Sequence, residues 1–225
     1  MSHVDQDTVS ATISRTERRQ YLWLLPLWLG AVAVGMGMLF AYSLTPGAAA
    51  QPPEIWPAST QLRLSEGKST IVLVAHPRCP CTRASISELS WLMSRLQGQV
   101  EGYVLFVKPQ GVGKNWEQTD LWRSASILDG VQVIADEGGV ESKKFGAYTS
   151  GQVYLYDRQG ALMFSGGITP TRSHQGDNVG RRRVVHYVTQ GSAERDTSAV
   201  YGCALNDEVS SESWLLRLTA AALAG

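Results

Sequence analysis

Residues 71–96 read IVLVAHPRCPCTRASISELSWLMSRL, an apolar run followed by two cysteines and a longer amphipathic segment. The short run 71–75 is apolar and largely β-branched, which predicts a buried strand. Apolar side chains then recur at helical spacing, so we expect a helix over residues 82–96. Three charged residues of that helix are expected to face water: Arg83, Glu88 and Arg95.

The two cysteines fall where the buried strand ends and the helix begins. Pro80 separates Cys79 from Cys81 and is tolerated in the first turn of a helix. Unpaired backbone N–H groups at the helix start, together with the charges of Arg78 and Arg83, favour a thiolate at this position. The local pattern therefore predicts activated sulfur.

Strand and helix patterns alternate along the rest of the chain. We expect strands over residues 102–107, 131–135, 152–156 and 161–165, and helices over residues 116–128, 141–145 and 178–189. Residues 157–160, DRQG, form a clear hairpin signal between the last two strands. This order predicts an α/β sandwich with a parallel portion and an antiparallel hairpin at one edge.

This topology would bring several separate segments to one rim of the sheet. Parallel strands deliver their carboxyl ends, and hence Cys79, to a single rim, and the start of the hairpin at residues 149–151 lies there too. The loop 166–177, which carries His174, is expected beside the cysteines. At about 3.3 Å per residue, an extended tail is long enough to return Cys203 to the same place.

The N-terminal part of the chain has a different composition. No charged residue occurs between Gln20 and Pro53, and residues 21–43 are long and apolar enough to cross a bilayer. A basic cluster precedes this segment, so residues 1–20 are expected to be a cytoplasmic tail. A Pro/Ala-rich linker over residues 44–57 and a folded domain over residues 58–225 would follow on the side of the membrane opposite the cytoplasm.

A cleaved signal peptide is the competing interpretation of this segment, but a signal core normally spans about 7–15 residues and this apolar run is longer. Either way the domain is exported. In an oxidising compartment three cysteines cannot all pair within one chain, so at least one stays free, awaits an external partner or binds a metal. The formal net charge of +0 gives no reason to expect a nucleic-acid partner.

The strand, the HPRCPC motif and the following helix resemble the thioredoxin-like superfamily. More narrowly, residues 60–205 resemble a small group of bacterial membrane-anchored thioredoxin-like proteins called RedB proteins. The resemblance is carried by the stretches HPRCPCTRAS, WEQTDLWRSA, FGAYTSGQ, SGGIT, GDN and YGCAL. It implies a thioredoxin-like sandwich, a single-pass bacterial inner-membrane location with the domain facing the periplasm, and a redox role.

Two departures separate this chain from ordinary thioredoxins. The usual C-x-x-C motif is here C-x-C, with Thr82 where the second cysteine would stand. The proline that normally precedes the fourth strand is missing, and Ser150-Gly151 takes its place. Docking of a substrate as in thioredoxin is therefore not assured.

The function expected is that of an extracytoplasmic thiol–disulfide oxidoreductase without a cofactor, acting on a protein thiol or disulfide. Cys79 aligns with the nucleophile and Cys81 would be the resolving thiol, because a C-x-C bridge is strained and labile. Cys203 is either a structural bridge or an exchanging third thiol. The residues expected to contact substrate are Pro80, Arg83, Thr149, Ser150, Gly151 and His174.

Two other functions remain open. Thiolates and an imidazole from Cys79, Cys81 and His174 would suit Cu(I), so a copper-binding or metallochaperone domain is the alternative. A thiol peroxidase is disfavoured, because no threonine stands three residues before Cys79.

Overall fold

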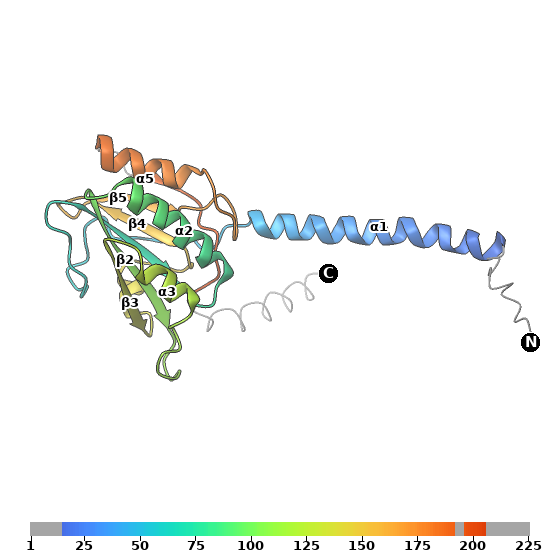
Figure 1. Cartoon of the computed structure of the whole chain (residues 1–225), viewed down its shortest axis with the longest axis horizontal. Helices are drawn as coiled ribbons and strands as arrows, with labels where there is room; N and C mark the ends of the chain where they lie inside the picture. The colour runs from blue at the N-terminus through green and yellow to red at the C-terminus, as the bar shows by residue number, and fades with distance from the viewer. Residues whose placement is uncertain (1–14, 192–195, 206–225) are drawn as a thin grey trace, which may run out of the picture. The chain divides into compact units, whose positions relative to one another are not determined.

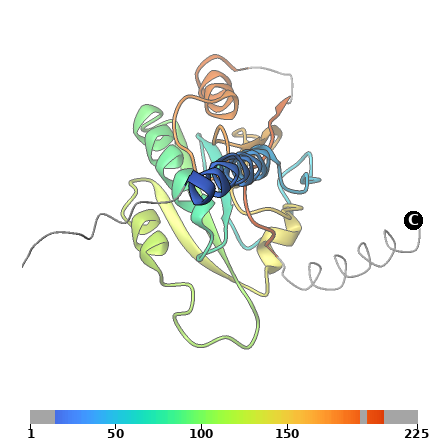
Figure 2. The ribbon, with the colours of Figure 1, turned by 90° about the vertical axis from the view of Figure 1, so that its right-hand side faces the viewer.

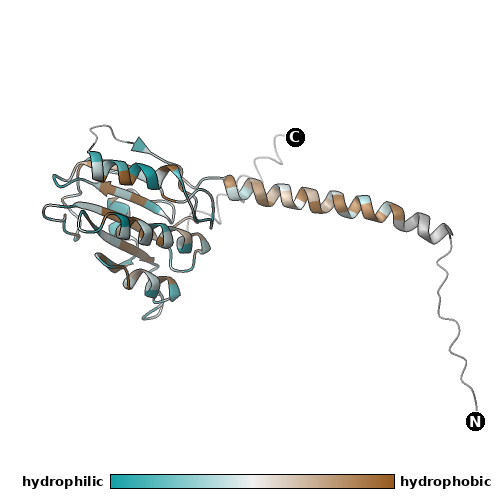
Figure 3. Ribbon diagram, turned by 45° about the horizontal axis from the view of Figure 1, so that its top comes forward, coloured by the Kyte–Doolittle hydropathy of each residue, from teal (hydrophilic) through white to brown (hydrophobic). Residues whose placement is uncertain are grey.

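The computed structural model describes residues 15–191 and 196–205 of the chain, which has 225 residues. Its contacts divide the chain into two units, with the boundary between Ser43 and Leu44. The first unit contains nearly all of helix α1 (Arg15–Leu44) (Figure 1). Within this helix, Leu22–Leu44 is apolar and long enough to cross a membrane, with a mean hydropathy of 2.0, and most of its ribbon carries the hydrophobic colour in Figure 3.

The second unit is built on a mixed sheet in the order β3-β2-β1-β4-β5-β6. The strands are β1 (Ser69–Ala75), β2 (Val100–Lys108), β3 (Val131–Glu137), β4 (Gln152–Tyr156), β5 (Leu162–Gly167) and β6 (Asp196–Thr197). The helices are α2 (Pro80–Arg95), α3 (Asp120–Ser126), α4 (Val140–Lys144) and α5 (Val179–Gln190). Strand β1 lies at the centre, parallel to β2 and antiparallel to β4, while β4 and β5 form the hairpin.

The order β1-α2-β2, followed later by β4-β5-α5, is the thioredoxin-like arrangement, and the predicted fold class is confirmed. Helix α3 and strand β3 extend the sheet beyond β2, as the pattern predicted. The short strand β6, which pairs in parallel with β5, was not expected. Residues 196–197 are too short a run for a sequence pattern to reveal.

Alternation along the central strand sorts its side chains into two cores. Ile71, Leu73 and Ala75 face α2, α3 and α5, which lie together on one side of the sheet (Figures 1 and 2). Val72 and Val74 face the opposite side, where Phe145, Tyr154 and Leu62 belong to the second core. Both faces of β1 are therefore buried, which fixes the position of the loop that follows it.

Residues 44–57, expected to be a linker, instead contact the domain. The N–H of Gln51 donates to the carbonyl of Gly146 at 3.4 Å, and the N–H of Trp56 donates to that of Gly160 at 2.7 Å. The Trp56 ring meets the edge of Tyr156 at a centroid distance of 5.1 Å. A Pro-rich segment cannot form its own ladder, but its backbone groups and one large aromatic ring find partners on the domain surface.

Helix α3 begins later than the expected 116–128. Asn115 takes a left-handed conformation, with φ of 66°, which interrupts a helix before it starts. The buried carboxylate of Glu117 then lies 3.2 Å from the Lys108 ammonium at the end of β2. This contact holds the segment against the sheet, and the helix starts only after Thr119.

Glu88 was expected to face water, and this is wrong. Its side chain is buried between α2 and α5, with one carboxylate oxygen 2.9 Å from the Arg181 guanidinium. The other oxygen accepts the backbone N–H of Gly176 at 2.6 Å. A carboxylate can be buried here because both of its oxygens are bonded to charged or N–H donors.

Candidate active site

Cys79 is the residue that caps helix α2. It has extended backbone angles, Pro80 occupies the first turn, and the N–H of Thr82 donates to the Cys79 carbonyl at 3.0 Å. The N–H of Cys79 in turn donates to the carbonyl of His76 at 3.2 Å, which tightens the loop after β1. The side chain therefore stands at the electropositive end of a long helix, as the sequence predicted.

The Cys79 sulfur lies 2.8 Å from the sulfur of Cys203, which is 124 residues further along the chain. The Cys203 thiol donates to it and lowers the pKa of Cys79 to about 5, against the opposing effect of burial. Backbone N–H groups of Cys203, Cys81 and Thr82 lower this pKa further. The same hydrogen bond and burial raise the pKa of Cys203, so the arrangement is a thiolate at Cys79 facing a thiol at Cys203.

Cys81 completes a group of three sulfur atoms that all lie within 4.8 Å of one another. It is buried in the first turn of α2 and accepts a hydrogen bond from the Ser173 hydroxyl at 3.4 Å. Ser173 belongs to the loop 166–177, which thus lies beside the cysteines as expected. None of the three cysteines is joined in a disulfide.

Cys203 is held in place by a short strand-like tail. The N–H of Ser150 donates to the Cys203 carbonyl at 2.8 Å, and the N–H of Leu205 donates to the carbonyl of Tyr148 at 3.0 Å. Thr149 and Ala204 form an antiparallel bridge between these two bonds. Residues 201–205 are therefore an added strand along residues 148–150, and Cys203 is the member that points at Cys79.

Ser150 also holds the cysteine loop from the other side. Its hydroxyl accepts the N–H of His76 at 2.9 Å and lies 2.8 Å from the Thr82 hydroxyl. Thr82 donates to the carbonyl of His76 at 3.0 Å, so the two hydroxyl groups bond both backbone groups of His76, at the start of this turn. Gly151, with φ of 92°, follows in a conformation that favours glycine, and its N–H bonds to Val74.

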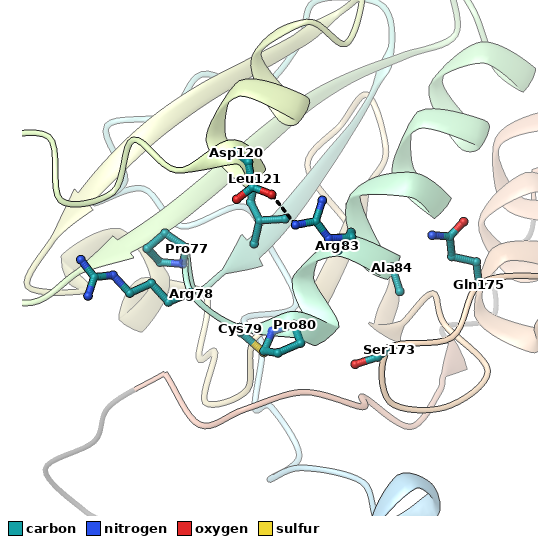
Figure 4. Close-up of a pocket in the computed structure, with 10 residues that line it drawn as sticks. All are labelled: Pro77, Arg78, Cys79, Pro80, Arg83, Ala84, Asp120, Leu121, Ser173 and Gln175. Atoms are coloured by element: carbon teal, nitrogen blue, oxygen red, sulfur yellow. Dashed lines mark hydrogen bonds and ion pairs between the residues drawn. The ribbon is translucent and has the colours of Figure 1, made fainter. Parts of the chain in front are cut away.

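The residues predicted to contact substrate fall mainly into two groups, one covered by the tail and one lining an open cleft. Ser150 and Thr149 lie under the tail, where the N–H of Ser150 donates to the Cys203 carbonyl and Thr149 pairs with Ala204, whereas the N–H of Gly151 donates to Val74 in β1. Pro80 and Arg83 line an open cleft of about 430 Å³ above Cys79, and Arg83 forms an ion pair with Asp120 (Figure 4). Ser173 lines the same cleft.

His174 stands apart from the sulfur group. Its Nδ1 lies 2.7 Å from the Arg172 carbonyl and 3.0 Å from the Thr171 hydroxyl, and the side chain is exposed. Within the described part of the chain, the group of closely spaced ligand atoms consists of the three sulfurs and includes no imidazole. Three soft thiolates remain a ligand set that suits Cu(I).

Two residues that the sequence did not single out contribute to the site. Arg172 donates from its guanidinium to the Gly202 carbonyl at 2.6 Å and so secures the tail next to Cys203. Trp116 receives the Arg78 guanidinium over its ring at 4.5 Å, beside the entrance to the cleft. The sequence signal for Arg172 is its place in the loop that topology put beside the cysteines. The signal for Trp116 is its place in the WEQTDLWRSA stretch that carries the resemblance.

Comparison with known proteins extends only to the fold. No protein-family model matches the chain. No curated protein matches it either.

Among solved structures, the crystal structure of the hypothetical protein SMc02350 from Sinorhizobium meliloti 1021 matches with a TM-score of 0.53 and 18% identity, over 72% of this chain and 94% of that one. An uncharacterized conserved protein from Geobacillus kaustophilus matches with a TM-score of 0.53 and 15% identity, over 75% and 95%. MTB DsbF, in its mixed oxidized and reduced forms, matches with a TM-score of 0.41 and 12% identity, over 56% and 83%, too distantly to support an argument. At these identities the chain shares a fold with the first two structures, and that fold is the thioredoxin-like one described above.

Proposed function

We propose that this protein is a membrane-anchored thiol–disulfide oxidoreductase whose exchanging pair is Cys79 and Cys203. The observation that carries the proposal is the 2.8 Å separation of a thiolate at Cys79 and a thiol at Cys203. A disulfide bond is about 2.05 Å long, so the two sulfurs need to approach by less than 1 Å to bond. The thiolate is the nucleophile of disulfide exchange, and here it is already formed at neutral pH.

The exchange follows from this geometry. The Cys79 thiolate attacks one sulfur of a partner disulfide, the partner's S–S bond breaks, and the other partner sulfur leaves with the electron pair. Cys203 then gives up its proton to that leaving thiolate and attacks the Cys79 sulfur. The mixed disulfide between Cys79 and the partner breaks, and the second partner sulfur leaves with the electron pair and takes up a proton from solvent. The products are a reduced partner dithiol and a Cys79–Cys203 disulfide, and the reverse sequence oxidises a partner dithiol.

The sequence predicted Cys81 as the resolving thiol, and in this proposal Cys81 is the alternative to Cys203. Its sulfur lies within 4.8 Å of the other two, whereas Cys203 is already hydrogen-bonded to Cys79. A bridge between Cys79 and Cys81 would also close a strained ring. These two facts favour Cys203 as the resolving thiol.

The setting that we propose is the periplasmic face of a bacterial inner membrane, with the N-terminus in the cytoplasm and a protein thiol or disulfide as partner. The support is the apolar segment Leu22–Leu44 and the basic residues that precede it in the sequence. The stretches shared with the RedB-type group favour membership of that group.

Disulfide mapping tests the exchanging pair. The full chain in detergent is equilibrated with reduced and oxidised glutathione, quenched with acid, alkylated and mapped by mass spectrometry. We expect a Cys79–Cys203 disulfide, no exchange in Cys79→Ser, and accumulation of a mixed glutathione disulfide on Cys79 in Cys203→Ser. Cys81→Ser is the matched control and should still form the Cys79–Cys203 bond. If Cys79 and Cys203 never pair under any glutathione ratio, the proposal is wrong.

The group of three sulfurs supports one second candidate, a Cu(I)-binding domain. Its ligands would be Cys79, Cys81 and Cys203, with Cys203 in the place that the sequence assigned to His174. Anaerobic titration with Cu(I) against a chromogenic chelator should then show one tightly held ion per chain. Binding should weaken in Cys203→Ser and persist in His174→Ala, and a chain that loses all copper to the chelator contradicts this candidate.

A further inference from the structure

The tail that carries Cys203 is held on residues 148–150 as a strand is held on a sheet edge. Two main-chain hydrogen bonds, from Ser150 N–H to Cys203 and from Leu205 N–H to Tyr148, fix its register. The side chain of Ala204 is exposed, while Gly202 is buried against the loop. Backbone hydrogen bonds therefore supply the attachment of the tail.

Gly202 fits this place because it has no side chain. A Cβ at this position would overlap the backbone oxygen of Ser150 and lie 3.3 Å from the Thr149 methyl group. The obstacle is backbone, so a rearranged side chain cannot relieve it. The position before the cysteine therefore accepts glycine and excludes every other residue while the register is kept.

Residues 148–150 and the tail thus show how an extended segment can bind beside Cys79 with its cysteine facing the Cys79 sulfur. The backbone of residues 148–150 aligns the segment, glycine lets it approach, and the next side chain delivers its sulfur to within 2.8 Å of the nucleophile. Main-chain pairing of this kind is a general way in which proteins bind extended peptides.

We propose that residues 201–205 occupy the docking edge for the partner, and that the partner is an extended polypeptide segment with glycine immediately before its reactive cysteine. This inference rests on the proposed function, since it identifies the kind of partner that the exchanging site accepts. The tail competes with that partner for the same backbone groups, and being part of the same chain it competes at high effective concentration. The partner binds when the tail leaves.

The step to be measured is exchange between Cys79 and a cysteine peptide activated as a mixed disulfide with thionitrobenzoate. The Cys79 thiolate attacks the peptide sulfur, the bond to thionitrobenzoate breaks, and thionitrobenzoate leaves with the electron pair and is read by its colour. One disulfide is consumed and one, between Cys79 and the peptide, is formed.

The experiment compares two peptides on full-length protein in detergent. The peptides are VYGCAL, which repeats residues 200–205, and VYACAL, in which alanine precedes the cysteine. The protein carries Cys81→Ser and Cys203→Ser so that Cys79 is its single thiol. Three proteins are compared on this background. The first has no further change, the second carries Gly202→Val to displace the tail, and the third carries Ala204→Val as the matched control at an exposed tail position.

Gly202→Val should react with VYGCAL about tenfold faster than the other two proteins do, because overpacking against Ser150 removes the competing tail. On Gly202→Val, VYGCAL should react about tenfold faster than VYACAL, which cannot approach the same edge. Equal rates for the two peptides, or no acceleration by Gly202→Val with its circular dichroism intact, would overturn the inference. The reaction of the same proteins with dithiobis(nitrobenzoate), a small disulfide, is measured in parallel. If Cys79 does not react even with this reagent, the proposed function itself fails.

Discussion

At the residue scale, the chemistry of the site comes from the proximity of Cys79 and Cys203. A helix start favours a thiolate, and the sequence was sufficient to predict that effect for Cys79. The largest contribution to its low pKa is the hydrogen bond from Cys203, which depends on how the tail lies. Chain length showed only that Cys203 can reach the site, because the register of the tail is set by close contact between Gly202 and Ser150, which no local pattern encodes.

The pH dependence of alkylation tests this pair. With a pKa of about 5, Cys79 is a thiolate at pH 7 and is protonated as the pH falls through 5. The rate of its reaction with iodoacetamide, followed by mass spectrometry, should therefore stay high down to pH 6 and fall to half near pH 5. In Cys203→Ala the main stabilising donor is lost, the pKa of Cys79 rises, and the rate at pH 7 should drop by about tenfold or more.

Cys81→Ala is the control for this measurement, because the side chain of Cys81 does not contribute to the low pKa of Cys79. Its rate profile should keep the midpoint near pH 5. An unchanged midpoint in Cys203→Ala would show that the helix start alone activates Cys79.

At the scale of elements, periodicity predicted the helices and strands better than it predicted which polar residues are buried. β1, α2, β2 and the hairpin follow directly from apolar runs and a turn signal. Helix α3 was misjudged because Asn115 and the ion pair between Glu117 and Lys108 override its helical pattern. Glu88 was assigned to the surface because periodicity cannot reveal that Arg181, 93 residues later, packs against it.

The contact between Glu88 and Arg181 should contribute substantially to stability. Arg181→Met leaves a buried carboxylate without its cation, so we expect the free energy of unfolding to fall by about 3 kcal/mol. The double variant Glu88→Gln with Arg181→Met removes both charges and should recover most of that loss. Urea denaturation of the full chain in detergent, followed by tryptophan fluorescence, measures each value.

Arg182→Met is the matched control for this series. Arg182 is the next residue on α5, and its ion pair with Asp177 is exposed. Exposed pairs contribute little, so the change should stay within about 1 kcal/mol. If Arg181→Met and Arg182→Met lower the free energy of unfolding equally, the buried contact contributes no more to stability than the exposed one.

At the scale of the whole molecule, composition predicted an apolar N-terminal segment and a folded domain over residues 58–225, and the contacts divide the chain between Ser43 and Leu44. What composition could not show is that residues 44–57 belong with the domain. Their partners, such as Gly146 and Gly160, are backbone groups far away in the sequence.

Membrane topology can be tested by reporter fusions. Alkaline phosphatase, which is active only outside the cytoplasm, is fused to the C-terminus of the full chain and should be active. Reversing the charges at Arg15, Arg18 and Arg19 to glutamate should lower this activity severalfold, because positive residues retain the N-terminus in the cytoplasm. The same reversal at Arg63 and Arg95, in the domain, is the control and should have little effect. High β-galactosidase activity from the same fusion point would contradict the proposed orientation.

The separation of 124 residues between the two exchanging sulfurs has an energetic consequence. A covalent link across a loop of this length restricts the unfolded chain and stabilises the native state by about 5 kcal/mol. By thermodynamic linkage the folded state stabilises the bond by the same amount, about 100 mV for a two-electron couple. The oxidised domain would then resist unfolding more than the reduced domain does. The melting temperature would therefore report the redox state of the Cys79–Cys203 pair.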